Sequence, residues 1–146
     1  MSGPPTKIAI HDRAIVEAFP STFLGLMLAD PSRLRPKRGD RSDAYFLSLV
    51  DGGSFTELLD RLLPGRSAST PSGDIRNHDD RAAFTCALTA LCVAAGDLTA
   101  VGDADGWIIL PPRATIPAWA WLELAANAGA EERGALHATR AHAGPA

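Results

Sequence analysis

The sequence has few cysteines, no long apolar run and no large excess of charge of one sign, and each shortage argues against a class of protein. Its 146 residues include two cysteines, Cys86 and Cys92, in a single apolar stretch. On a helix, a spacing of six residues puts two side chains about 240° apart in azimuth, so these thiols could not form a disulfide within it. A disulfide framework and a cysteine-ligated metal site are therefore not expected. Buried thiols in a reducing compartment are the better interpretation.

No segment is predicted to enter a membrane. The longest apolar run, residues 82–95, includes two threonines and is shorter than the roughly 20 residues that span a bilayer. The first residues lack the basic start and apolar centre of a secretory signal. We therefore expect a cytoplasmic protein with no membrane partner.

Charge and motifs narrow the function further. The net charge of −3 gives no general basic footprint for nucleic acid, and 46% hydrophobic residues are ordinary for one globular domain. The sequence has no glycine loop followed by Lys-Ser/Thr and no Gly-x-Ser-x-Gly elbow, so a P-loop NTPase or a serine hydrolase is unsupported. The four histidines show no metal-ligand spacing.

Hydrophobic periodicity predicts helices alternating with a few short strands. A strand is expected over residues 14–20, with Glu17 on the face of Ile15 and Phe19, and Pro20 ends it. Ser21 then looks like the N-cap of a short helix. Further helices and two short strands around a "DADG" turn follow. The expected helices cover residues 22–30, 42–50, 54–63, 78–95 and 117–129, and the two strands lie within 98–112.

Two loops and one turn carry local sequence signals. Residues 33–41 hold five basic side chains and form either a solvated connection or a contact for phosphate groups. Residues 64–73 are rich in Pro, Gly and Ser and predict a long loop. "GDADGW" predicts a hairpin turn and not a calcium loop, because Val101 and Pro112 occupy the first and twelfth ligand positions.

The stretch "NHDD", residues 77–80, stands directly before the apolar run. Asn77 is a good N-cap, and the helix dipole favours Asp79 and Asp80 in the first turn by ~0.3–1 kcal/mol each. These acids are thus explained as a helix start. Alternatively, Glu17 could lie on a core strand opposite them, and converging carboxylates are the oxygen ligands of a magnesium site for phosphodiester hydrolysis. A third interpretation makes Glu17 a solvent-facing residue of an edge strand.

Three segments in order carry a resemblance to a known family: "VEAFPSTFLGLML", "KRGDRSDAYFLSLV" and "NHDDRAAFTCALTALCVAAGDLTAVGDADGWIILPP". Together they resemble the C-terminal half of an uncharacterised family of predicted RNase H-like nucleases. The resemblance covers residues 14–128. It implies an α/β fold, a partial RNase H-like domain with few strands and several flanking helices that lacks the N-terminal strands. Residues 1–13 would be a flexible N-terminus and 129–146 a disordered tail.

The resemblance also implies a site. Glu17, Asp79 and Asp80 would be the catalytic acids of a nuclease dependent on Mg²⁺ or Mn²⁺, and Glu17 and Asp79 would hold the metal. The Lys37–Arg38 pair would match a basic position of the family. With the basic loop as a whole on a nucleic-acid substrate, the phosphate-binding residues would be Arg35, Lys37, Arg38 and Arg41.

The sequence departs from the family pattern in two places. Family members begin with a strand that bears the first acid, followed by two further strands, whereas few residues precede Glu17 here. Many members also have an acid inside the late helix where this chain has Ala82. The chain is therefore expected to be truncated and inactive alone, and to self-associate or need a complementing half-domain. The alternative is a non-catalytic half-domain that binds a protein or nucleic-acid partner.

Overall fold

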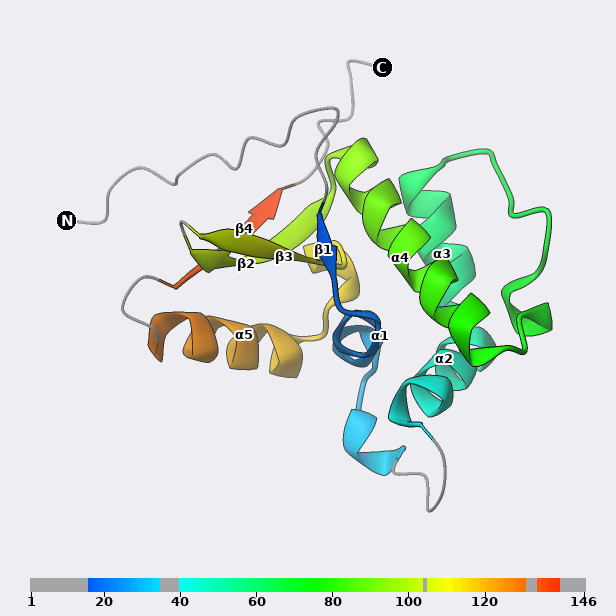
Figure 1. The fold of residues 1–146 in the computed structure, drawn as a ribbon, viewed down its shortest axis with the longest axis horizontal. Helices are drawn as coiled ribbons and strands as arrows, with labels where there is room; N and C mark the ends of the chain where they lie inside the picture. The colour runs from blue at the N-terminus through cyan, green and yellow to red at the C-terminus, as the bar shows by residue number, and fades with distance from the viewer. Residues whose placement is uncertain (1–15, 35–39, 104, 131–133, 140–146) are drawn as a thin grey trace.

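Helices and a small mixed sheet alternate along the chain in the computed structural model, which describes residues 16–34, 40–103, 105–130 and 134–139 (Figure 1). The strands are β1 (Glu17–Ala18), β2 (Leu98–Asp103), β3 (Gly106–Leu110) and β4 (Ala135–Thr139). The helices are α1 (Pro20–Met27), α2 (Arg41–Asp51), α3 (Ser54–Leu62), α4 (His78–Ala95) and α5 (Ala118–Ala130). Short 3-10 turns are η1 (Pro31–Arg33), η2 (Ser72–Asp74) and η3 (Arg113–Thr115).

The sheet has the strand order β1-β3-β2-β4. β2 and β3 form the expected antiparallel hairpin, with Gly102 opposite Trp107, and β4 pairs antiparallel with the other side of β2. β1 pairs parallel with β3, with Glu17 opposite Ile108. The predicted α/β class is therefore confirmed. Among the described residues, β1 is an edge strand.

The two faces of the sheet are covered by different helices. Along β3, Ile109 belongs to the main core with α1–α4, whereas Ile108 and Leu110 belong to a smaller cluster with Ala120 of α5. Side chains alternate between the faces of a strand, so α5 and α2–α4 lie on opposite faces, while α1 also contributes Leu26 to the smaller cluster. Figure 1 shows the same layering, with α5 below the sheet and the other helices gathered to the right of it.

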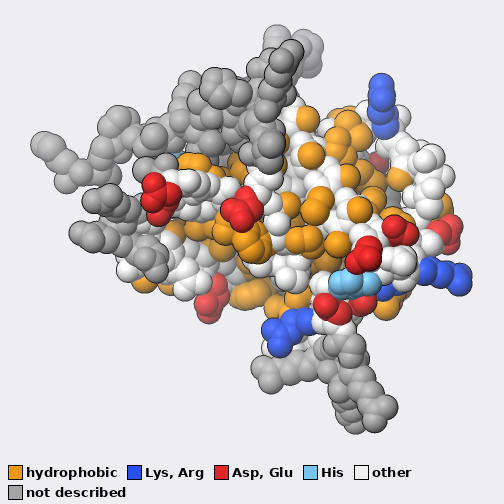
Figure 2. Space-filling view, viewed as in Figure 1, with side chains coloured by type: hydrophobic (Ala, Val, Ile, Leu, Met, Phe, Trp, Pro, Cys, Tyr) orange, Lys and Arg blue, Asp and Glu red, His pale blue; other side chains and the backbone are white. Residues whose placement is uncertain are grey.

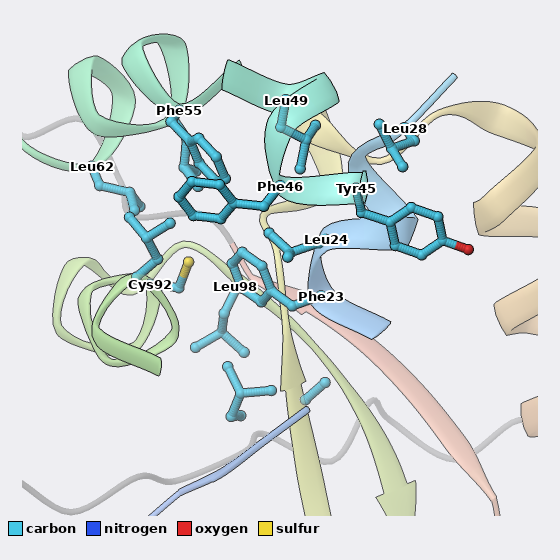
Figure 3. Packing of buried hydrophobic residues seen from close by; sticks show 14 residues of the cluster. Phe23, Leu24, Leu28, Tyr45, Phe46, Leu49, Phe55, Leu62, Cys92 and Leu98 are labelled. Carbon is cyan, nitrogen blue, oxygen red and sulfur yellow. The ribbon is translucent and has the colours of Figure 1, made fainter. Parts of the chain in front are cut away.

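Aromatic side chains hold the main core together. The rings of Phe46 and Phe55 lie 4.8 Å apart, and Phe84 of α4 packs edge-on against Phe55 at 5.4 Å. Figure 3 shows Phe46 and Phe55 facing Leu24 and Cys92 across the interior. Burying each such side chain contributes roughly 1.5–3 kcal/mol, so this contact between α2, α3 and α4 is a main source of stability.

The helix α4 starts and ends where the sequence predicts. The Asn77 side-chain oxygen accepts hydrogen bonds from the backbone N–H groups of Asp79 and Asp80, at 2.8 and 3.3 Å. Gly96 ends the helix with a left-handed φ of 66°. The expectation of two buried thiols holds only for Cys92, where burial raises the pKa of the thiol to about 12. Cys86 is exposed, because it lies on the solvent side of α4.

Two predicted boundaries near the N-terminus are wrong. α1 begins with Pro20 at its first position and Phe19 as N-cap without a side-chain hydrogen bond, so Ser21 is not the cap. Proline's fixed φ suits the first turn and lets the helix start directly after β1. Similarly, Arg41 is the first residue of α2 and not part of a loop, because the Asp40 side chain accepts from Ser42 N–H at 2.7 Å.

The expected disordered tail is wrong for residues 135–139, which form β4. The residues of this segment by themselves predict a strand only weakly. However, β2 offers them a full set of backbone hydrogen-bond partners from Leu98 to Gly102. Pairing to an existing strand thus orders a segment that local sequence leaves undecided. The predicted flexible N-terminus, residues 1–13, lies outside the described residues. No helix in the described ranges is long and apolar enough to cross a membrane.

Candidate functional site

The predicted acids lie at the surface. Glu17 is exposed on the edge strand β1, and Asp79 and Asp80 are exposed in the first turn of α4. Within the described ranges, no group of three or more His, Cys, Asp or Glu side chains could hold a metal ion. The residues present there do not fit a three-ligand magnesium centre. The catalytic role of these acids stays a prediction from the resemblance.

Most of the predicted phosphate-binding residues cannot be placed. Arg35, Lys37 and Arg38 lie outside the described residues. Arg41 is exposed at the start of α2. Arg33, at the start of the basic loop, forms an exposed ion pair with Asp30 at 3.0 Å.

A cleft lined by several polar side chains lies where α1, α2 and α4 begin, and we name it the helix-start cleft. It encloses about 200 Å³. Ala82 is one of its lining residues and offers only a methyl group. The full lining is Pro20, Ser21, Leu24, Asp40, Ser42, Asp43, His78, Arg81, Ala82 and Thr85.

Ion pairs connect the start of α2 with the start of α4 inside this cleft. His78 Nδ1 and Arg81 Nη1 both lie 3.2 Å from Asp43 Oδ1. His78 Nε2 lies 3.9 Å from Asp40 Oδ2 on the other side of the ring. Arg81 also donates from Nε to the carbonyl of Ile75 at 2.8 Å. In Figure 2, histidine, acidic and basic side chains gather at one end of the visible face.

Contacts in the cleft shift the pKa values of His78 and Asp40. The hydrogen bond to Asp43 raises the pKa of His78, with help from the nearby charge of Asp40. The Ser42 hydroxyl, followed by the Ser42 backbone N–H, lowers the pKa of Asp40. The cations and carboxylates of the cleft thus balance one another. The network is suited to fastening two helix starts together, and it leaves few free groups for chemistry on a substrate.

The sequence analysis did not select the residues that meet in this cleft. Asp40-x-Ser42 is a recognisable cap pattern, and it could have identified the start of α2. The contact of Asp43 with His78 and Arg81 joins segments more than thirty residues apart. No spacing rule for one chain segment detects such a contact.

Comparison of the chain with protein-family models, curated proteins and solved structures finds no match in any of the three.

Proposed function

We propose that the chain is a non-catalytic half-domain that binds a protein partner at the β1 edge of its sheet, and that a second copy of the chain can take this place. The main observation in support is that β1 pairs with β3 on one side and with no other described strand. An edge strand presents backbone N–H and C=O groups that another strand can pair with. Parallel strands are moreover usually internal and covered, so a parallel edge favours further pairing.

Exposed apolar side chains near this edge support a protein partner. Phe19, directly after β1, is 42% exposed. β3 runs parallel to β1 and leads through η3 into α5, so the first turn of α5 lies at the same end of the sheet. There Trp119 is 38% and Leu122 69% exposed, and Trp119 Nε1 donates to the carbonyl of Leu28. Large aromatic and aliphatic side chains suit a protein interface better than a nucleic-acid one.

Sedimentation velocity over a wide concentration range tests this function. We expect the wild type to form dimers. Phe19→Ser removes an apolar contact and supplies a capping hydroxyl to α1, so this variant should stay monomeric while keeping its helix content. Leu47→Ser is the matched control, because Leu47 is similarly exposed at 46% but lies on α2. A wild type that is monomeric at every concentration, or a control that dissociates equally, would contradict the proposal.

A second candidate is a metal-dependent nuclease that a partner completes. One observation favours it: β1 leads directly into α1, whose first residues line the helix-start cleft together with His78 and Arg81 from the first turns of α4. The segments that carry Glu17 and Asp79 therefore approach one region, which supports this candidate. A third carboxylate ligand for the metal would have to come from outside the described residues.

Calorimetric titration with Mn²⁺ or Mg²⁺ tests this candidate without a guess about substrate. The variants are Glu17→Gln and Asp79→Asn, with Asp51→Asn at the far end of α2 as the control. Saturable binding that is lost in the first two variants alone would support a shared metal site. A folded wild type that binds neither ion would exclude this candidate for the chain acting by itself.

A further inference from the structure

A second cleft, which we name the α3 cleft, lies between α3, the end of α1 and the η3 turn. It encloses about 380 Å³ and is lined by Met27, Ser54, Glu57, Arg61, Ala114 and Thr115. It shares no lining residue with the helix-start cleft. None of the acids or basic residues predicted from the sequence lines it.

Arg61 is held in a fixed position at this cleft. Its Nε donates to Asp97 Oδ2 at 2.6 Å. The Asp97 side chain is only 8% exposed and that of Arg61 25% exposed, so the pair is largely shielded from water. A guanidinium fixed through Nε keeps its plane, and its terminal N–H groups can still donate to a carboxylate in two parallel hydrogen bonds.

Glu57 provides an opposite charge beside this guanidinium. It lies four residues before Arg61 on α3, in the order that usually forms an ion pair along a helix. Arg61 pairs with Asp97 instead, and Glu57 is exposed at the cleft with no ion pair among the described residues. The cleft therefore presents a cationic and an anionic group that do not neutralise each other, with Met27 and Ala114 as apolar wall.

We propose that the α3 cleft binds a small zwitterion of the α-amino acid class, with the ligand carboxylate on Arg61 and the ammonium group on Glu57. A simple anion would be repelled by the Glu57 carboxylate, and a simple cation by the Arg61 guanidinium. A molecule with both charges a few ångströms apart matches each group, and a cleft of this volume accepts it together with an aliphatic side chain.

NMR titration of the amide-labelled full chain with L-leucine tests the proposal. Leucinamide, which lacks the carboxylate, and isocaproate, which lacks the ammonium group, are the matched analogues. We expect leucine to shift the amide signals of α3 and η3 saturably. Each analogue should bind about tenfold more weakly, because each loses one charged hydrogen bond.

Glu57→Gln is the decisive variant, because Glu57 is exposed and its replacement leaves the Arg61–Asp97 pair intact. We expect it to weaken leucine binding about tenfold and to leave isocaproate binding equal or stronger. Glu123→Gln, at an exposed position of α5, is the control and should change nothing. The proposal is overturned if leucine gives no saturable shifts, if an analogue binds as well as leucine, or if Glu57→Gln leaves leucine affinity unchanged.

Discussion

Thr99, the second residue of β2, buries its hydroxyl without a hydrogen-bond partner among the described residues. Its neighbours across the sheet are Leu110 and Ala138, which offer no side-chain acceptor. An unpaired buried hydroxyl costs stability, and an isosteric methyl group in its place does not. We expect Thr99→Val to raise the free energy of unfolding by ~1 kcal/mol in urea denaturation.

The matched control for this change is Thr99→Ser, which keeps the hydroxyl and removes the methyl group. It should be less stable than the wild type by about 1 kcal/mol, the ordinary cost of a deleted buried methyl group. A valine variant that unfolds at lower urea than the wild type would show that the hydroxyl has a stabilising partner.

Gly102 allows the hairpin to close. A Cβ atom added at this position would lie 2.1 Å from the carbonyl oxygen of Gly106, and the clash is with backbone that cannot rotate away. At Gly106 the same atom would meet nothing within 4 Å. We therefore expect Gly102→Ala to cost about 2 kcal/mol or more of stability, and Gly106→Ala to cost much less. Thermal unfolding followed by circular dichroism would compare the two, and equal losses would argue against the steric explanation.

At the scale of elements, the start of α4 should respond to pH. Asp43 holds the pKa of His78 above its ordinary value of 6.5, so the folded state binds this proton more tightly than the unfolded chain. The contribution of the His78–Asp43 pair to the stability of the fold is therefore fully present below pH 6.5. It is lost as the pH rises through the raised pKa of His78 in the folded state.

NMR titration of the His78 ring protons measures this pKa directly. We expect Asp43→Asn to lower it, because the hydrogen bond and the charge of Asp43 are the largest causes of the shift. Asp51→Asn, at the other end of α2, should leave it unchanged. A His78 pKa at or below 6.5 in the wild type would show that the contact does not persist in solution.

The same helix shows how far the sequence alone can predict this fold. Asn77 and Gly96 mark its ends because capping depends on a few adjacent residues, and the structure has both caps. β4 was not predicted, because its order comes from pairing with β2 and not from its own residues. The helix-start cleft was missed for the same reason, since Asp43 and His78 meet only after α2 and α4 have packed.

At the scale of the whole molecule, the pair of Arg61 and Asp97 joins the helix layer to the sheet. Arg61 lies on α3, and Asp97 lies between the end of α4 and the start of β2. Since Asp97 is almost fully buried, its carboxylate depends on Arg61 for compensation. We expect Arg61→Met to lower the free energy of unfolding by ~3 kcal/mol, because it leaves a buried charge without a partner.

Replacing both members should cost far less than replacing one. In Arg61→Met combined with Asp97→Asn no charge is left unpaired, and the buried amide needs only neutral hydrogen-bond partners, so we expect a loss of about 1 kcal/mol. Guanidinium denaturation of the wild type, both single variants and the double variant gives a double-mutant cycle that measures the interaction between the two side chains. Strict additivity would mean that the two side chains act independently, and the connection between α3 and the sheet would then rest on the apolar contacts of the main core, to which α3 contributes Phe55, Leu58 and Leu62.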